Sequence, residues 1–200
     1  MGEIVVRKMK SEDLDSVVRI HLEAFPGFFL SFLGSSFLRE LYISIISDPS
    51  GLAYVSVDFD NVNGFVAGTD NPVDFYQRLL RKRWWRFAWA ASFSALKRPT
   101  IILRLIRSFS RGQQPDVREN CATLMSIAIS PEAQRNGIGR SLVKVFLQEA
   151  LNRKLMYVNL TTDKFNNEAV NRFYQNLGFI LYQTFITPEG RAINEYQYEL

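Results

Sequence analysis

The sequence has few of the residues that build metal sites and disulfides. Its 200 residues include one cysteine, Cys121, and one histidine, His21. A lone cysteine excludes an intramolecular disulfide, and the two residues together supply too few ligands for a zinc site. We therefore expect no metal in the chemistry of this protein.

Long apolar runs are also missing. No stretch reaches the roughly 18 consecutive apolar residues that a membrane-spanning helix needs, since the apolar segment 87–96 is bounded by Arg86 and Lys97. The first residues lack the basic stretch, apolar run and cleavage site of a secretory signal. We expect a cytoplasmic protein that does not cross the bilayer.

What remains is the composition of an ordered protein. Hydrophobic residues make up 47% of the chain and charged residues 22%, which excludes wholesale disorder. A chain of this length is typical of one domain with a sizeable core. We predict a single domain over residues 1–200.

Acidic residues are absent from one long segment. Between Phe75 and Pro115 there are ten basic residues and no acidic ones, so the rest of the chain carries 14 minus 20, or −6. The same segment holds Trp84, Trp85 and Trp89. Its apolar residues recur at helical spacing, which predicts two basic amphipathic helices broken near Pro99 within an insert over residues 71–115.

Three interpretations of this basic insert stay open. Cationic helices with tryptophans suit peripheral contact with an anionic membrane through residues 75–111. Nucleic-acid binding is compatible with clustered arginines and aromatic rings, but no recognised motif is present and we do not expect it. The third interpretation is a helical lid or a homodimer contact with a solvated basic face.

The remaining segments alternate between strand and helix patterns. The expected strands cover residues 3–7, 52–57, 62–68, 122–129, 155–160, 179–186 and 192–199, and the expected helices cover 11–25, 36–46, 137–152 and 167–176. This order predicts a mixed α/β fold.

One stretch carries a recognisable chemistry. An apolar strand is followed by the loop Gln134-Arg135-Asn136-Gly137-Ile138-Gly139 and at once by an amphipathic helix. A helix that begins at closely spaced glycines presents unpaired main-chain N–H groups and a positive dipole end, which favour a phosphate. Arg135 and Arg140 flank the turn and could add charge-assisted hydrogen bonds.

The loop resembles the acetyl-CoA signature of the GNAT superfamily of N-acetyltransferases, Gln/Arg-x-x-Gly-x-Gly/Ala. The stretch from Asn167 to Tyr174, closed by Gly178-Phe179, is similar to the second signature of that family. The resemblance implies a mixed, mostly antiparallel sheet with helices on both sides, with the basic insert placed after the third strand.

The resemblance also implies roles for particular residues. The pantetheine arm of acetyl-CoA would bond to the strand Ile127-Ala128-Ile129, and its pyrophosphate would lie on the turn that follows. Tyr174 would give a proton to the leaving thiolate. The implied cofactor-binding residues are Ile127, Ala128, Ile129, Gln134, Arg135, Asn136, Gly137, Ile138, Gly139, Arg140, Ser141 and Asn167.

The expected reaction is direct acetyl transfer from acetyl-CoA to a primary amine of a small molecule or amino sugar. Thr162 argues against a peptide or protein amine as the acceptor, because relatives that modify protein amino termini carry Glu at this position. The rival is a non-catalytic CoA-binding module that acts through the basic insert. Asp116, Glu119 or a water could be the base, and the apolar run 25–30 fits an acceptor site and core packing equally well.

Overall fold

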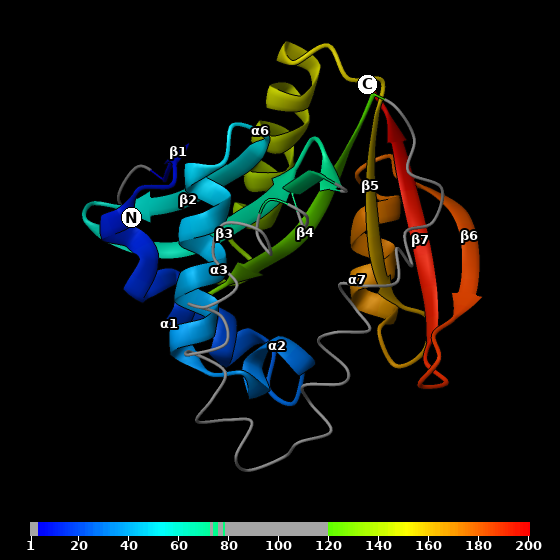
Figure 1. The fold of residues 1–200 in the computed structure, drawn as a ribbon, viewed down its shortest axis with the longest axis horizontal. Helices are drawn as coiled ribbons and strands as arrows, with labels where there is room; N and C mark the ends of the chain where they lie inside the picture. Colours follow the sequence, from blue (N-terminus) through cyan, green and yellow to red (C-terminus); the bar gives the residue numbers. More distant parts are fainter. Residues whose placement is uncertain (1–3, 73, 76–77, 79–119) are drawn as a thin grey trace.

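The computed structural model describes residues 4–72, 74, 75, 78 and 120–200 (Figure 1). Within them, seven strands form one sheet in the order β1-β2-β3-β4-β5-β7-β6. The strands are β1 (Val5–Lys8), β2 (Gly51–Asp58), β3 (Asn61–Thr69), β4 (Cys121–Ile129), β5 (Tyr157–Asp163), β6 (Ile180–Ile186) and β7 (Ala192–Glu199). The helices are α1 (Leu14–Ala24), α2 (Phe29–Phe32), α3 (Ser35–Ser47), α6 (Ile138–Asn152) and α7 (Glu168–Gln175), with short 3-10 turns η1 (Ser11–Asp13) and η2 (Pro131–Ala133).

The one parallel contact in this sheet positions the site. Every neighbouring pair of strands is antiparallel except β4 and β5. Those two pair only over a short stretch, from Cys121 opposite Tyr157 to Thr123 opposite Asn159. Beyond it the two strands separate, as Figure 1 shows. The sheet therefore opens between the C-terminal halves of β4 and β5.

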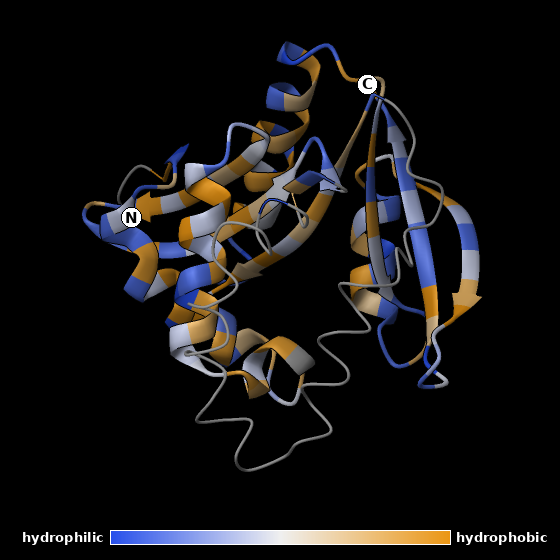
Figure 2. Cartoon of the chain, viewed as in Figure 1, coloured by the Kyte–Doolittle hydropathy of each residue, from blue (hydrophilic) through white to orange (hydrophobic). Residues whose placement is uncertain are grey.

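Helices cover both faces of the sheet and bury two apolar cores. On one face, α1 and α3 pack Leu14 and Phe37 against Phe65 of β3. On the other face, α6 packs Phe146 against Val66 of the same strand. Figure 2 shows apolar and hydrophilic residues alternating along these helices, as a one-sided apolar stripe requires. β3 thus has both faces buried, and it anchors the two layers.

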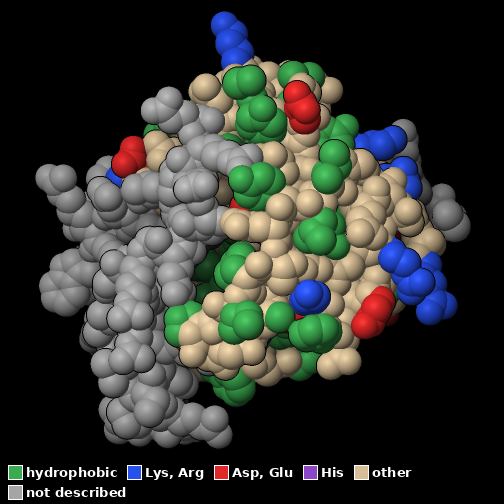
Figure 3. Space-filling view, turned by 90° about the vertical axis from the view of Figure 1, so that its right-hand side faces the viewer, with side chains coloured by type: hydrophobic (Ala, Val, Ile, Leu, Met, Phe, Trp, Pro, Cys, Tyr) green, Lys and Arg blue, Asp and Glu red, His purple; other side chains and the backbone are tan. Residues whose placement is uncertain are grey.

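The last strand of the sheet, β6, carries apolar side chains on the surface (Figure 3). Ile180 and Ile186 are about three-quarters exposed, and Leu181 is nearly half exposed. Its pairing partner is β7, which lies between β6 and β5. The exposed apolar surface on this side is therefore spread along an edge strand.

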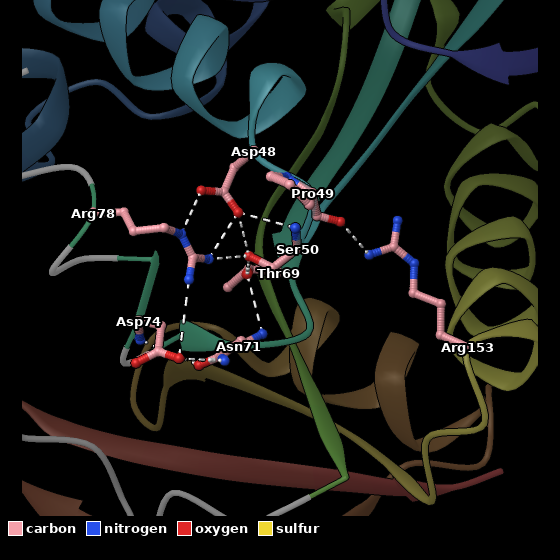
Figure 4. Close-up of polar contacts among 8 residues, drawn as sticks. All are labelled: Asp48, Pro49, Ser50, Thr69, Asn71, Asp74, Arg78 and Arg153. Atoms are coloured by element: carbon pink, nitrogen blue, oxygen red, sulfur yellow. Dashed lines mark hydrogen bonds and ion pairs between the residues drawn. The ribbon is translucent and has the colours of Figure 1, made fainter. Parts of the chain in front are cut away.

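A polar cluster ties the residues that follow β3 to the turn between α3 and β2 (Figure 4). Arg78 donates hydrogen bonds of 2.8 Å from Nε and Nη2 to the Asp48 carboxylate, and Ser50 donates to the same group. Burial raises the pKa of Asp48, but these hydrogen bonds outweigh it and lower the pKa to about 2. At the end of α6, Arg153 donates to the Pro49 carbonyl and to Asp70. The cluster fixes Arg78 beside the body of the sheet.

The mixed, mostly antiparallel sheet flanked by helices confirms the expected fold class. Three local expectations were wrong: α2 was not expected as a helix, β1 covers Val5–Lys8 where residues 3–7 were expected, and β5 covers Tyr157–Asp163 where residues 155–160 were expected. Apart from residues 71, 72, 74, 75 and 78, the insert expected over 71–115 lies outside the described residues, together with its proposed membrane, nucleic-acid and homodimer contacts. In the described part of the chain, no helix is long and apolar enough to cross a membrane.

Candidate active site

A cavity of about 1110 Å³ occupies the opening between β4 and β5. Its lining comes from four parts of the fold: the end of α1 and the loop after it, the separated halves of β4 and β5, the turn into α6, and α7 with the β6–β7 turn. Segments far apart in the sequence therefore converge on one space. The cavity is the natural place to look for chemistry.

The turn between η2 and α6 is built from two residues with left-handed backbone. Arg135 has φ 69° and Gly137, the N-cap of α6, has φ 76°. A Cβ on Gly137 would meet no atom within 4 Å, so the turn is open above this residue. The first N–H groups of α6 have no earlier helical carbonyl to bond, and they face this opening with the positive end of a 15-residue helix. The geometry suits an anion.

Gly139 is glycine for a different reason. A Cβ there would lie 3.3 Å from both Ile129 Cδ1 and Phe173 Cζ, which is tight. The absence of a side chain lets α6 begin close to β4 and α7. The two glycines of the turn thus have separate tasks, one conformational and one of packing.

Most of the predicted site residues line the cavity. Those that do are Ile127, Ile129, Gln134, Arg135, Gly137, Ile138, Gly139, Arg140, Asn167 and Tyr174. Ala128, Asn136 and Ser141 do not. Ala128 is buried in the core beneath α1 because side chains alternate along a strand, while Asn136 and Ser141 are exposed.

Tyr174 lies on α7 with its ring against the core. It is 5% exposed, and its ring packs edge-on against Phe173 and Phe179. Burial raises the pKa of the Tyr174 phenol above its ordinary value of 10. The hydroxyl therefore stays protonated at neutral pH and can donate a proton in the cavity.

Asn167 occupies the N-cap position of α7. Its side chain makes no capping hydrogen bond. It donates instead to the Thr162 hydroxyl and, at 3.4 Å, to the Asp163 carbonyl of β5. Asn167 therefore fastens the start of α7 to the strand that borders the cavity.

Below the cavity, a buried polar chain joins three elements. His21 Nδ1 of α1 lies 2.6 Å from Tyr42 Oη of α3, and that hydroxyl donates to Ser126 Oγ of β4 at 3.3 Å. His21 and Ser126 line the cavity. His21 is 3% exposed, and burial lowers its pKa to about 4, so the imidazole is neutral at pH 7.

At the far end of the cavity, beside the apolar run 25–30, lie two charged residues that no sequence pattern predicts. Asp163 and Arg191 line the cavity and form an ion pair, with hydrogen bonds of 2.7 to 3.1 Å. The Arg191 guanidinium lies 5.5 Å from the centre of the Phe28 ring. Asp163 follows Thr162 directly and could have been noticed there, whereas the pairing with Arg191 depends on the β5–β7 register. The acids suggested as the base, Asp116 and Glu119, lie outside the described residues.

The sheet opens between two parallel strands, above a glycine turn that leads into a helix. This fold is that of the acetyltransferase class. The family model described as "Acetyltransferase (GNAT) family" matches residues 14–179, and the chain belongs to that family of acyltransferases. A search of curated proteins finds no match.

Solved structures of the same fold are similar over nearly the whole chain. Ribosomal-protein-alanine N-acetyltransferase from Brucella melitensis is 14% identical with a TM-score of 0.65, covering 98% of this chain and 99% of its own. PaiA N-acetyltransferase from Thermoplasma acidophilum, in complex with coenzyme A, is 15% identical with a TM-score of 0.58 and coverage of 98% and 99%. A chimera of spermidine N-acetyltransferase SpeG from Vibrio cholerae and hSSAT is 16% identical with a TM-score of 0.64 and coverage of 99% and 96%.

Proposed function

We propose that this chain transfers an acetyl group from acetyl-CoA to a primary amine of a small molecule. The observation that carries the proposal is the continuity of the cavity. The same space is lined by the Gly137 turn, by Tyr174 and by Phe28 of the loop after α1. An anion site, a proton donor and an apolar wall therefore open onto one space, as a two-substrate transfer requires.

The residues of the cavity fit coenzyme A by their chemistry. The N–H groups at the start of α6, with Arg135 and Arg140 beside them, suit a diphosphate. Beyond Thr123, β4 has no pairing with β5, so main-chain groups of Ile127 and Ile129 are available to the amide-rich pantetheine arm. Acetyl-CoA would supply a thioester, and the chain would hold it in place.

The chemistry needs little from the protein beyond placement. A neutral amine attacks the thioester carbonyl, so that a C–N bond forms while the C–S bond breaks. The attacking nitrogen loses one proton to water, Tyr174 gives its phenolic proton to the leaving thiolate, and the phenolate regains a proton from water. A phenol is protonated throughout the neutral range, so this proton is present when the thiolate leaves.

A small-molecule acceptor is favoured over a protein amine by one feature of β5. Relatives that modify protein amino termini carry Glu at the position of Thr162. Thr162 has no carboxylate, and its hydroxyl accepts a hydrogen bond from the Asn167 side chain. Similar structures include enzymes named for spermidine and for ribosomal protein alanine, so the fold leaves the acceptor open.

The test is an acetyl-CoA consumption assay with amino sugars, polyamines, arylalkylamines, amino acids and peptides, followed by release of free thiol. We expect turnover with at least one small primary amine. Coenzyme A binding with no turnover on any acceptor would favour the non-catalytic rival. Turnover confined to peptides would contradict the small-molecule assignment.

A further inference from the structure

The part of the cavity wall at the end of α1 is a run of aromatic rings. His21 lies in the last turn of α1, Phe25 is the residue that ends this helix, and Phe28 follows in the loop. Their ring centres are 4.9 Å apart between His21 and Phe25 and 5.6 Å apart between Phe25 and Phe28. All three line the cavity. The wall runs from the buried imidazole out to Phe28, which is 43% exposed.

The β6–β7 side of the cavity carries both apolar and polar groups. Phe185 of β6 and Ile193 of β7 line it, with Thr187 and Arg191 from the turn between them. An amine that enters here meets hydrocarbon on both sides. An apolar ligand would remove this apolar surface from water. The burial of apolar surface is the main source of affinity in such pockets.

The charged groups at this end are already matched to each other. Asp163 accepts hydrogen bonds on both carboxylate oxygens from Arg191. Arg191 in turn lies against the Phe28 ring, where a guanidinium is attracted by the π electrons. An acceptor with several ammonium groups would have to displace Arg191 to reach this carboxylate, and it would lose hydration against the rings.

We infer that the acceptor is a primary amine on an apolar body, an aromatic one above all, and that Phe28 is the residue that selects it. The inference rests on the proposed acetyl transfer and narrows it to one substrate class. The amine would project toward Tyr174 while the ring of the acceptor packs along Phe25 and Phe28. Amino sugars and polyamines would bury less apolar surface against the same aromatic rings.

The experiment compares three small primary amines, 2-phenylethylamine, putrescine and glucosamine, in the acetyl-CoA consumption assay. We expect kcat/KM for 2-phenylethylamine to exceed that of the other two by about tenfold or more, since matched apolar contacts discriminate on this scale. Phe28→Ala should lower kcat/KM for 2-phenylethylamine about tenfold, mainly through KM. Phe28→Leu should lie between the wild type and Phe28→Ala.

Phe32→Ala is the matched control, because Phe32 is 49% exposed and lies outside the cavity lining. It should leave all three acceptors unchanged. Calorimetric binding of coenzyme A reports folding of each variant, and the wild-type ranking of acceptors decides the question even where a variant does not fold. Faster turnover of putrescine or glucosamine, or an equal loss for all acceptors in Phe28→Ala, would overturn the inference while leaving acetyl transfer intact. No turnover with any amine would overturn the proposed function and this inference with it.

Discussion

Asn171 of α7 accepts a hydrogen bond of 3.2 Å from the side chain of Asn194 in β7. The same Oδ1 accepts a second hydrogen bond from Tyr196 Oη at 3.0 Å. Its Nδ2 group donates to the main-chain carbonyls of Asp163 and Asn167. One buried amide therefore has all of its hydrogen-bonding capacity filled, and it joins α7 to two strands beside the cavity.

Removing that amide should loosen α7. In Asn171→Ala, Asn194 and Tyr196 lose a buried acceptor, and we expect the free energy of unfolding to fall by about 2 to 3 kcal/mol. Urea denaturation measures the loss. Asn152→Ala, at an exposed asparagine at the end of α6, is the control and should change stability by no more than about 0.5 kcal/mol. Equal stability of the two variants would contradict the role of Asn171.

The stability of the protein should depend on pH through its single histidine. His21 has a folded-state pKa of about 4, below the ordinary 6.5, because burial disfavours the charged ring. The unfolded chain then binds a proton more readily, so stability is full above pH 6.5 and falls as the pH drops toward 4. The loss would reach about 3 kcal/mol at most.

Denaturation curves at several pH values between 7 and 4 measure this dependence. His21→Gln removes the titrating group and should flatten the profile between pH 6.5 and 4. Acid-induced loss that is the same in the variant and the wild type would assign the effect to other groups.

Tyr174→Phe should separate binding from turnover. The substitution keeps the packing against Phe173 and Phe179 and removes the proton donor. We expect kcat to fall by about 100-fold, with coenzyme A affinity unchanged by calorimetry. Tyr182→Phe, on β6 and outside the cavity lining, is the control and should keep its activity. Full activity of Tyr174→Phe would remove the tyrosine from the mechanism.

Gly137→Ala tests the turn at the start of α6. The left-handed backbone at φ 76° is unfavourable for alanine by about 1 to 2 kcal/mol. The methyl group also projects into open space above the turn. We expect stability to fall by this amount and the Kd for coenzyme A to rise about tenfold.

Gly190→Ala supplies the matched control. Gly190 has φ 82° and equally open surroundings, but it lies in the turn between β6 and β7. Its variant should lose similar stability and bind coenzyme A as the wild type does. If both variants bound the cofactor equally well, the turn at Gly137 would not be its site.

Much of the fold could be predicted from local patterns. The strands around Val66 and Ala128 and the helix that follows Gly137 have apolar spacings that define them almost to the residue. The four-residue helix α2 could not be predicted, because a run such as Phe28 to Leu33 has no helical periodicity to distinguish it. The start of β5 was misplaced because Leu155 is apolar. Its main-chain N–H still donates to the carbonyl of Ala150 in α6, so the strand begins only after this residue.

The glycine turn and Tyr174 could be singled out from the sequence, whereas at the other end of the cavity only the apolar run 25–30 could be, and not its contact with Arg191. Gly137, Gly139 and Tyr174 belong to short motifs whose spacing is visible in the sequence. Phe28 and Arg191 are 163 residues apart, and they meet because the β6–β7 turn reaches the loop after α1. Contacts of that kind are decided by sheet order and register, which a single sequence does not display.

The central claim is that main-chain N–H groups at the start of α6 hold the diphosphate of coenzyme A. Titration calorimetry with coenzyme A and with pantetheine, which lacks the nucleotide diphosphate, tests it most directly. We predict that coenzyme A binds and that pantetheine binds at least about 100-fold more weakly, since charge-assisted hydrogen bonds to the diphosphate supply the difference. Equal affinity for the two ligands, or no heat with coenzyme A, would contradict the claim.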